Sequence, residues 1–469
     1  MNSEKLVQSR YFHILRKNGV TALYHSLNLQ TLYLDNHLAH AFDIFKKLTS
    51  PRNFLNSIPD QYRNNAIRLI EQAKNNGILI SNTIDDDNLL KKHQDYYLKK
   101  PQIGILYLVL TLRCNLECKY CFLKPSLLKL SAKSYDMDLN TVAESIKVYG
   151  RNLSSNASRK TIILYGGEPL LNKKAIEFVF EKVSEMKFRN ELPQDLAITI
   201  NTNATLVTKD ICKLFKKYDV AVSVSLDGPK EIHDKNRIKF NGKGSFSDTI
   251  SGFYKFKETG VQTGISCTVT SDVIDYLPEI TNWFIKDLKA DFLGFNPLTY
   301  TKPKQSIDPI YAKRYTSALI RSFKIARDLG CYEDRMMRKI ESFVKGEIYP
   351  FDCAGCGRQM VVAPDGQIGV CHAYLDSRRY FCNCKLENFI AEKENHWLEW
   401  CRRSPIGMNE CVDCIALGIC GGGCPHNSDL LSGSIWALDE FFCIYSRNVL
   451  EWMIWDAWEN LNENFSDKI

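Results

Sequence analysis

Three closely spaced cysteines are the first residues that could carry chemistry. Cys114, Cys118 and Cys121 stand in the stretch RCNLECKYCF, directly after the apolar run Ile105–Leu112 that predicts a strand. Three thiolates in a short loop suit a cubane iron–sulfur cluster with one iron left without a protein ligand. A structural zinc ion would prefer a fourth Cys or His close by, and His93 lies well upstream. An open iron predicts that another molecule binds to it.

A second, denser set of cysteines lies beyond residue 350. Its spacing is C-x2-C, then x14 to a third cysteine, then C-x2-C-x5-C-x3-C, then x18 to the last. These cysteines divide into two four-cysteine sites. Each site could hold an iron–sulfur cluster, and a structural zinc ion is the alternative occupant. The residues are Cys353, Cys356, Cys371, Cys411, Cys414, Cys420, Cys424 and Cys443.

The remaining cysteines, of 17 in total, are Cys212, Cys267, Cys331, Cys382, Cys384 and Cys401. Cys212 and Cys267 sit in apolar patterns and are expected in the core. Cys382 and Cys384 are separated by one residue, which would suit a redox or substrate-handling pair, although such a pair in a cysteine-rich loop can also be incidental.

Glycines and polar residues follow the later apolar runs. The stretch Tyr165–Pro169 reads YGGEP, in which the two glycines allow close backbone approach and Glu168 can accept hydrogen bonds from an ammonium group. Asn203 ends the next run and Ser225 another, with Arg237 further along the chain. An ordinary glycine-rich turn and strand-end polar groups are the plainer interpretation.

The elements that must position these residues alternate from about residue 103 to 330. Apolar runs are separated by amphipathic stretches such as Ile176–Met186, which predicts βα repetition and a parallel sheet or barrel. Barrel enzymes place their chemistry at the carboxyl ends of the strands, where the residues above fall. The runs are 105–112, 161–164, 196–200, 220–226 and 264–269.

The two ends of the chain have other patterns. Short strands at 11–15, 21–27 and 31–34 precede helices around 38–45 and 66–73, which suggests a winged-helix-like module. Residues 81–101 have the composition of a linker. The aromatic stretch 441–461 predicts a helix packed against the barrel.

The composition of the chain argues against several classes of protein. The chain has 469 residues, a net charge of +7 and 45% hydrophobic residues, typical of a globular protein of two or three domains. It has no apolar run long enough to span a membrane and no secretory h-region, so we expect a cytoplasmic protein without a membrane partner. The mild positive charge does not indicate nucleic acid.

The first cysteine loop resembles the signature of the radical S-adenosylmethionine (SAM) enzymes, C-x3-C-x-aromatic-C, with Tyr120 as the aromatic residue. The resemblance implies that the open iron binds SAM and that reductive cleavage yields a 5′-deoxyadenosyl radical. It also implies that Gly166, Gly167, Glu168 and Pro169 bind the SAM amino group. By the same resemblance Ser225 holds the ribose, Arg237 holds the carboxylate, and Asn203 belongs to the cofactor-binding residues.

The second cysteine set resembles the SPASM domain, the auxiliary-cluster extension of radical SAM enzymes that modify peptides and proteins. Its C-x(9–15)-G-x4-C element matches Cys356, Gly366 and Cys371. The resemblance implies two auxiliary 4Fe–4S clusters, hence three in all. One would use Cys353, Cys356, Cys371 and Cys424, and the other Cys411, Cys414, Cys420 and Cys443.

Together these features predict an α/β protein. We expect a partial (β/α)6 TIM-like barrel with an N-terminal winged-helix-like module and a Cys-rich C-terminal iron–sulfur domain. The expected boundaries are 1–95 for the module, 101–335 for the barrel, 345–445 for the SPASM domain and 446–469 for a terminal helix.

The N-terminal module resembles the recognition element of enzymes that mature ribosomal peptides, which binds the leader of a precursor by strand addition. The resemblance therefore favours a radical SAM oxidoreductase that abstracts hydrogen from a precursor peptide and forms a crosslink (carbon–carbon, ether or thioether). An electron would leave through the auxiliary clusters. A flavodoxin or ferredoxin is the expected electron donor.

Other functions remain open. A peptide epimerase would use Cys382 or Cys384 as hydrogen donor. Sulfatase-maturing enzymes carry an Asp where this chain has His372, which could act as a base, and formylglycine formation on a protein therefore remains an alternative. Maturation of a quinone or other cofactor subunit is another. A metal-cluster scaffold that binds a peptide without catalysis is the alternative of a different class.

Overall fold

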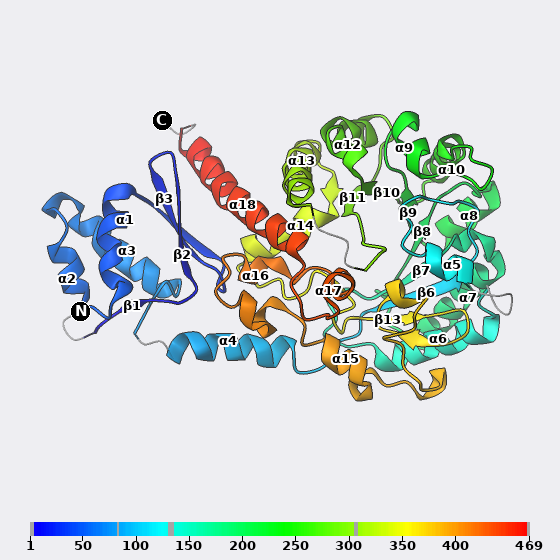
Figure 1. The fold of residues 1–469 in the computed structure, drawn as a ribbon, viewed down its shortest axis with the longest axis horizontal. Coiled ribbons are helices and arrows are strands. Elements are labelled where there is room, and N and C mark those ends of the chain that lie inside the picture. The colour runs from blue at the N-terminus through cyan, green and yellow to red at the C-terminus, as the bar shows by residue number, and fades with distance from the viewer. Residues whose placement is uncertain (1–3, 82–83, 130–135, 304–307, 467–469) are drawn as a thin grey trace.

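The computed structural model describes residues 4–81, 84–129, 136–303 and 308–466 (Figure 1). Its centre is a nine-stranded sheet in which all neighbouring strands are parallel except the last pair. In order across the sheet the strands are β12 (Tyr332–Glu333), β11 (Phe292–Pro297), β10 (Thr263–Val269), β9 (Ala221–Ser225), β8 (Ala197–Thr202), β7 (Thr161–Gly166), β6 (Ile105–Thr111), β13 (Gln359–Val362) and β14 (Ile368–Gly369).

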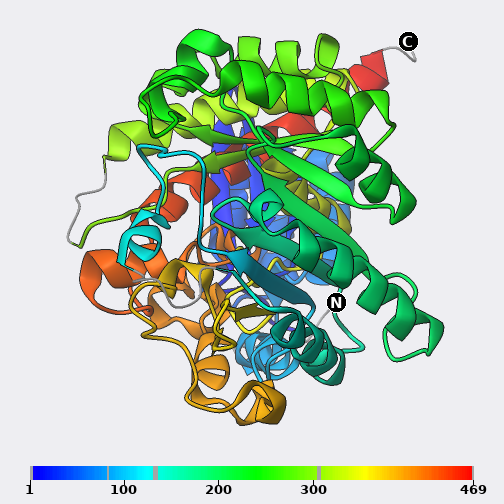
Figure 2. The same ribbon diagram turned by 90° about the vertical axis from the view of Figure 1, so that its right-hand side faces the viewer.

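Six of these strands, β6 to β11, lie side by side in chain order, and each is followed by helix, which confirms the βα repetition and the partial barrel (Figure 2). The large helices between them have one buried face, as expected of helices that cover a sheet. The helices are α5 (Lys124–Lys129), α6 (Leu139–Asn152), α7 (Lys173–Phe188), α8 (Lys209–Lys217), α9 (Lys230–Asn236), α10 (Phe246–Glu258), α11 (Ser271–Ile274), α12 (Leu277–Lys286), α13 (Pro309–Asp328) and α14 (Asp334–Lys345).

The sheet is larger than the expected six strands. Strand β13 comes from the cysteine-rich region and pairs in parallel with β6, with Val362 opposite Leu108. Every residue of β13 is buried, yet its four residues are too few to give a periodic signal. This pairing returns the C-terminal chain to the first barrel strand, the strand that leads into Cys114.

The C-terminal region beyond β14 is built of 3-10 turns and short helices, followed by one long helix, α18. They are the 3-10 turns η4 (His372–Tyr374), η5 (Leu386–Asn388), η6 (Ala391–Lys393), η7 (Pro405–Gly407) and η8 (Asn409–Cys411), and the helices α15 (Asn395–Trp400), α16 (Leu417–Cys420), α17 (Pro425–Ser432) and α18 (Glu440–Ser466). The terminal helix α18 begins at Glu440, before the expected boundary at 445/446, and contains Cys443.

The N-terminal module contains the predicted strands and helices. Strands β2 (Phe12–Lys17), β3 (Val20–His25) and β4 (Gln30–Asp35) form an antiparallel meander, followed by α1 (Asn36–Phe42), η1 (Asp43–Lys46), α2 (Pro51–Asn56), η2 (Asp60–Tyr62) and α3 (Arg63–Asn75). A separate pair, β1 (Val7–Gln8) with β5 (Leu79–Ile80), closes the module. Leu23, Phe42 and Phe54 belong to its own hydrophobic core.

The three-stranded sheet is covered on both faces. One face contributes Leu23 to the module core, whereas the other places Ala22 and Tyr24 in the main core of the protein. On the second face Tyr33 packs its ring 5.0 Å from that of Trp458 and donates a hydrogen bond to the carbonyl of Ile454 at 2.5 Å. Helix α18 therefore packs on the module as well as on α13, and not on the barrel alone (Figure 1).

The expected linker at 81–101 is wrong, because most of it is helix α4 (Ile84–Tyr97). Its first turn carries Asp85, Asp86 and Asp87, and acidic residues there stabilise the positive end of the helix dipole. Asp86 is buried and accepts hydrogen bonds from the Ser9 hydroxyl and from the Arg10 amide, both at 2.7 Å. No helix among the described residues is long and apolar enough to span a membrane.

Asp86 provides a test of how α4 holds the module. Asp86→Ala leaves the Ser9 hydroxyl and the Arg10 amide without their acceptor, so we expect a loss of about 1–3 kcal/mol in unfolding free energy. Asp87→Ala, at an exposed neighbouring carboxylate, is the control and should change it by less than about 0.5 kcal/mol. Anaerobic denaturation followed by hydrogen exchange of residues 4–81 measures both, and equal effects would contradict this role.

Candidate active site

The loop with the three nearby cysteines begins where β6 ends. Two backbone hydrogen bonds attach it to the segment at the end of α9: Glu117 N donates to the Ile238 carbonyl at 2.7 Å, and Lys119 N to that of Asn236 at 2.9 Å. The thiols of Cys114, Cys118 and Cys121 are partly buried, and burial raises the pKa of each.

The two glycines after β7 pack against this loop. A Cβ on Gly166 would lie 2.2 Å from the Thr111 carbonyl, and one on Gly167 would lie 2.2 Å from that of Arg113. Gly166 also has φ of +140°, which favours glycine. The glycines are therefore needed for the contact of β7 with the cysteine loop itself. That contact places Glu168 N in a 2.8 Å hydrogen bond with the Arg113 carbonyl.

Glu168 is a buried carboxylate with nearly all of its acceptor sites in use. Oε1 accepts from the Thr202 hydroxyl at 2.7 Å and from Leu170 N at 3.0 Å, while Oε2 accepts from Asn203 N at 2.8 Å. One lone pair of Oε2 remains for another donor. Desolvation raises the pKa of Glu168 to about 7 despite these bonds. Asn203 in turn donates from Nδ2 to Asn115 Oδ1, 2.9 Å away in the cysteine loop.

Arg237 already has a carboxylate partner, which the sequence did not reveal. Asp227, fully buried, accepts from Arg237 Nε at 3.0 Å and Nη2 at 3.1 Å, from Thr268 N at 3.0 Å, and from the Tyr120 hydroxyl. The guanidinium also lies 5.4 Å from the Tyr120 ring centroid, and its charge lowers the pKa of Cys118 against the effect of burial. Asp227 thus fixes Tyr120 and Arg237 beside the cysteine loop.

The other predicted residue here, Ser225, lies half-buried at the end of β9, at the same end of the sheet. The signal for Asp227 was present in the sequence, in SLDGP directly after that strand, but a carboxylate among strand-end polar groups does not reveal which cation it will meet.

His372 lies among aromatic rings from three other segments. Its ring centroid is 4.9 Å from that of Tyr107 on β6, 4.9 Å from Tyr165 on β7 and 5.6 Å from Phe122, the residue after Cys121. Burial lowers the pKa of His372 to about 4, so the imidazole is neutral at pH 7. Its Nδ1 is buried without a hydrogen-bond partner among the described residues. The residue after Cys371 is thereby brought next to the first cysteine loop.

The second cysteine set is partly to fully buried, and two buried cations lie among its segments. Lys339, fully buried, donates to the carbonyls of Ile419 and Cys420 at 3.0 and 2.9 Å, and its Nζ lies 3.7 Å from Asp352, the residue before Cys353. It therefore bridges segments from both predicted sites.

Arg403, also fully buried, donates to the carbonyls of Ile435, Gly422 and Ala437 and to the Ser428 hydroxyl. No ion pair to a carboxylate is found for it among the described residues. Burial raises the pKa of Cys353, Cys356 and Cys411, and the charge of Arg403 opposes that rise, so this cation lies near thiols of both predicted sites.

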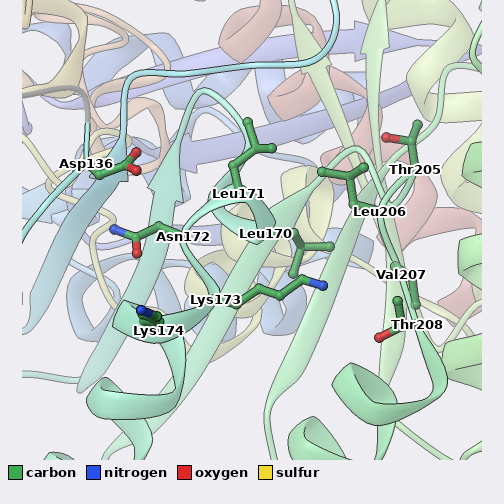
Figure 3. Close-up of a pocket in the computed structure, with 10 residues that line it drawn as sticks. All are labelled: Asp136, Leu170, Leu171, Asn172, Lys173, Lys174, Thr205, Leu206, Val207 and Thr208. Atoms are coloured by element: carbon green, nitrogen blue, oxygen red, sulfur yellow. The ribbon is translucent and has the colours of Figure 1, made fainter.

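An open depression of about 710 Å³ lies beside the Glu168 loop (Figure 3). It is lined by residues that follow β7 and β8, including Lys173, Lys174 and Thr205, together with Asp136. None of the cysteines lines it, and we assign it no role in the chemistry.

Comparison with known proteins identifies the barrel. Residues 108–292 match the model of the radical SAM superfamily. This chain contains a radical SAM domain.

Three proteins illustrate its relationships. The radical SAM cyclopropyl synthase TigE of Paramaledivibacter caminithermalis is 25% identical over 94% of both chains. A cysteine-type anaerobic sulfatase-maturating enzyme of Clostridium perfringens is 27% identical over 75% of this chain and 96% of its own length. The crystal structure of Streptococcus suis SuiB bound to precursor peptide SuiA shares the fold, with a TM-score of 0.52 and 16% identity over 93% of this chain and 99% of SuiB.

The radical SAM domain implies SAM and an iron–sulfur cluster, and the residues present fit such groups. All 17 cysteines are free of disulfide bonds. Among the described residues, only one set of donor side chains is close enough to share a single ion, and it lies outside the predicted cluster sites. Among the described residues, the cysteines of the loop and of the two C-terminal sets do not bring three donor atoms within 4.8 Å of one another, the close spacing that a single ion needs. The buried charge of Arg403, which has only neutral hydrogen-bond acceptors among the described residues, fits the net negative charge of four-cysteine clusters.

Asp227→Ala tests the ion pair of the radical SAM domain. It leaves the buried Arg237 guanidinium unpaired, so we expect a loss of about 3–5 kcal/mol in stability. Asp248→Ala, which removes an exposed partner of Lys239, should cost about 0–1 kcal/mol. Anaerobic denaturation with hydrogen exchange of β9 and β10 measures the difference. If β9 and β10 in Asp227→Ala kept the hydrogen-exchange protection of the wild type, the ion pair would not stabilise the fold.

Proposed function

We propose that this protein is a radical SAM peptide maturase that removes two hydrogen atoms from a precursor peptide and forms a new bond, most simply carbon–carbon. The observation that carries the proposal is the N-terminal module. Similarity to a cyclopropyl synthase runs over 94% of both chains, whereas a sulfatase-maturating enzyme is matched over almost its whole length by only 75% of this chain. The quarter of this chain that the sulfatase-maturating enzyme does not match is about as long as the N-terminal module together with α4.

The module would hold the leader of the precursor. Both faces of its three-stranded sheet are covered, so the remaining open positions are the edges, β2 and β4, which lack a strand partner among the described residues. An extended peptide can pair with such an edge through its main chain. The half-exposed residues of β2 from Phe12 to Leu15 fit an open edge. Holding the leader there raises the local concentration of the rest of the peptide at the barrel.

The barrel residues would hold the cofactor. Cys114, Cys118 and Cys121 would ligate the cluster that binds SAM, which supplies a 5′-deoxyadenosyl radical when reduced by a donor such as a flavodoxin or ferredoxin. Glu168 would accept a hydrogen bond from the SAM amino group with its remaining Oε2 lone pair, next to Asn203. Ser225 would lie at the ribose.

Arg237 would serve the SAM carboxylate only in part. Asp227 occupies Nε and one terminal nitrogen, which leaves the second terminal nitrogen for another acceptor.

His372 would receive the proton that leaves the peptide. Its neutral imidazole has no hydrogen-bond partner for Nδ1 in the part of the chain that the structure describes, and it lies between rings from β6, β7 and the cysteine loop. Bond formation would remove one hydrogen atom from the peptide and then one proton and one electron, and the bound SAM and clusters would supply the chemistry that accepts the hydrogen atom and the electron. His372, next to Cys371, would be placed to take the proton.

Formylglycine formation on a sulfatase is the second candidate, because sulfatase-maturating enzymes match 75% and 67% of this chain. The histidine in place of aspartate and the additional module favour a peptide precursor. An epimerase would need Cys382 or Cys384 as hydrogen donor, and these thiols face each other and Glu394 instead.

The test is anaerobic co-expression with small peptides encoded nearby, followed by mass spectrometry. A loss of two hydrogens confined to one residue supports ring closure within a side chain, and a loss shared by two residues supports a crosslink. Removing the leader from the precursor should abolish modification but spare slow uncoupled SAM cleavage. Turnover of a sulfatase peptide, with no neighbouring peptide changed, would overturn the proposal.

Glu168 predicts a pH dependence of SAM binding. With its pKa raised to about 7, the carboxyl is mostly protonated at pH 6, and a neutral carboxyl binds an ammonium group less strongly than a carboxylate does. We therefore expect SAM affinity to rise roughly fivefold to tenfold from pH 6 to pH 7.5. Glu168→Gln should bind weakly with no such slope, while the exposed Glu185→Gln control keeps it. Calorimetry measures this, and a persisting slope in Glu168→Gln would exclude the assignment.

Arg403 tests the auxiliary clusters. Anaerobically reconstituted enzyme should hold about twelve irons, four for each cluster. Arg403→Met removes the buried cation near both four-cysteine sites, so its iron content should fall toward about four to eight. Arg402→Met, at the exposed neighbouring residue, should retain all of it. Full iron loading and unchanged cluster spectra in Arg403→Met would contradict the role of this charge.

His372→Asn should separate peptide chemistry from SAM cleavage. Loss of a proton acceptor typically costs 10²- to 10⁴-fold, so we expect product formation to fall by at least about 100-fold while deoxyadenosine is still released. His396→Asn, in the same region but away from the three rings, is the control. Unchanged product formation in His372→Asn would remove this residue from the mechanism.

A further inference from the structure

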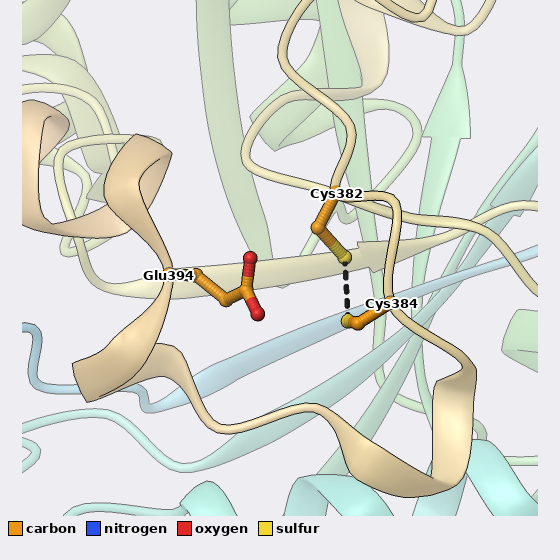
Figure 4. A group of neighbouring side chains, drawn as sticks. All are labelled: Cys382, Cys384 and Glu394. Carbon is orange, nitrogen blue, oxygen red and sulfur yellow. Dashed lines mark hydrogen bonds between the residues drawn. The ribbon is translucent and has the colours of Figure 1, made fainter.

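Two cysteines outside all predicted cluster sites face a carboxylate. Cys382 is buried and its sulfur lies 3.1 Å from that of the half-buried Cys384. With Glu394 they form a group whose donor atoms all lie within 4.8 Å of one another (Figure 4). The other unassigned cysteines have no such partner: Cys212 and Cys267 are core residues, as expected from the sequence.

The donor set suits a soft divalent cation. Two thiolates and one carboxylate are ligands that zinc takes, and three protein ligands leave a fourth position for water. Sulfurs bound to one tetrahedral zinc ion lie roughly 3.8 Å apart, so a small rotation of the two side chains would admit the ion.

Without a cation this site concentrates three acidic groups. Burial, with the neighbouring Cys382 and Glu394, raises the pKa of the Cys384 thiol. A bound divalent cation would take the place of the two thiol protons and offset the repulsion between the three ligands.

The three residues come from two segments that need to be held together. Cys382 N donates to the carbonyl of Ile368 on the edge strand β14 at 2.9 Å. Glu394 directly precedes α15, whose Trp397 donates from Nε1 to the Gln359 carbonyl on β13 at 2.9 Å. On the same helix Trp400 packs against Gly355, between Cys353 and Cys356. The connection between the two segments contains only 3-10 turns.

We propose that Cys382, Cys384 and Glu394 bind one zinc ion, separate from the iron–sulfur clusters, with water as the fourth ligand. The ion releases two protons on binding and ties the edge of the sheet to α15, the helix that supports the Cys353–Cys356 loop. The proposal does not depend on which peptide or protein the enzyme modifies.

The test uses reconstituted holoenzyme dialysed anaerobically against zinc buffers, with zinc and iron both counted by mass spectrometry. We expect one zinc per chain beside the full iron content, and X-ray absorption at the zinc edge should show two sulfurs at about 2.3 Å with oxygen ligands. The double variant Cys382→Ser, Cys384→Ser should bind zinc at least 100-fold more weakly, and Glu394→Gln about tenfold. Cys331→Ser, at a half-buried thiol elsewhere, should bind normally.

A second measurement does not depend on how well the variants fold. In wild-type enzyme, zinc should slow alkylation of Cys382 and Cys384 at least tenfold and leave Cys331 unchanged. Equal zinc uptake by the double variant, zinc with four sulfur ligands, or isolation of Cys382 and Cys384 as a disulfide would each overturn the proposal.

Discussion

The contact between the ends of β6 and β7 determines the geometry of the whole site. Gly166 and Gly167 lie so close to the backbone of Thr111 and Arg113 that any side chain would collide with it. This contact fixes the cysteine loop and Glu168 relative to each other before any cofactor binds. Because both ends belong to adjacent parallel strands, the register of the sheet sets the position of the cysteine loop relative to Glu168.

Buried charge is the second recurring theme. In the barrel Asp227 neutralises Arg237, so this pair is complete within the protein. In the C-terminal region every hydrogen-bond acceptor found for Arg403 among the described residues is neutral, while the buried carboxylate of Asp439 acts on it through its charge. The guanidinium also lies near the thiols of Cys353, Cys356 and Cys411. A buried cation is costly unless negative charge lies near it, so Arg403 would favour negatively charged groups bound by these cysteines.

Much of the fold was predictable because long apolar runs with helical spacing between them specify βα units. The cysteine spacings likewise indicated the kind of site. The features that were not predicted depend on contacts between residues distant in sequence. Strand β13 is too short to show a period of two, and the many charged residues of α4 resemble those of a linker. Asp227 is one of several polar residues after a strand, and the sequence does not show which of them meets Arg237. Arg403 had no local signal, because its burial follows from backbone carbonyls that converge only in the folded protein.

Helix α18 carries Cys443 in its first turn and, three to four turns later, presents Trp455 and Trp458 to Tyr33 of the N-terminal sheet. An α-helix rises 1.5 Å and turns 100° per residue. Inserting or deleting a single residue between these points would rotate the tryptophans off the sheet or the cysteine away from its partners. The number of residues between Cys443 and the two tryptophans is therefore fixed by the structure. Substitutions at solvent-facing positions of this segment should be accepted, whereas insertions and deletions should not.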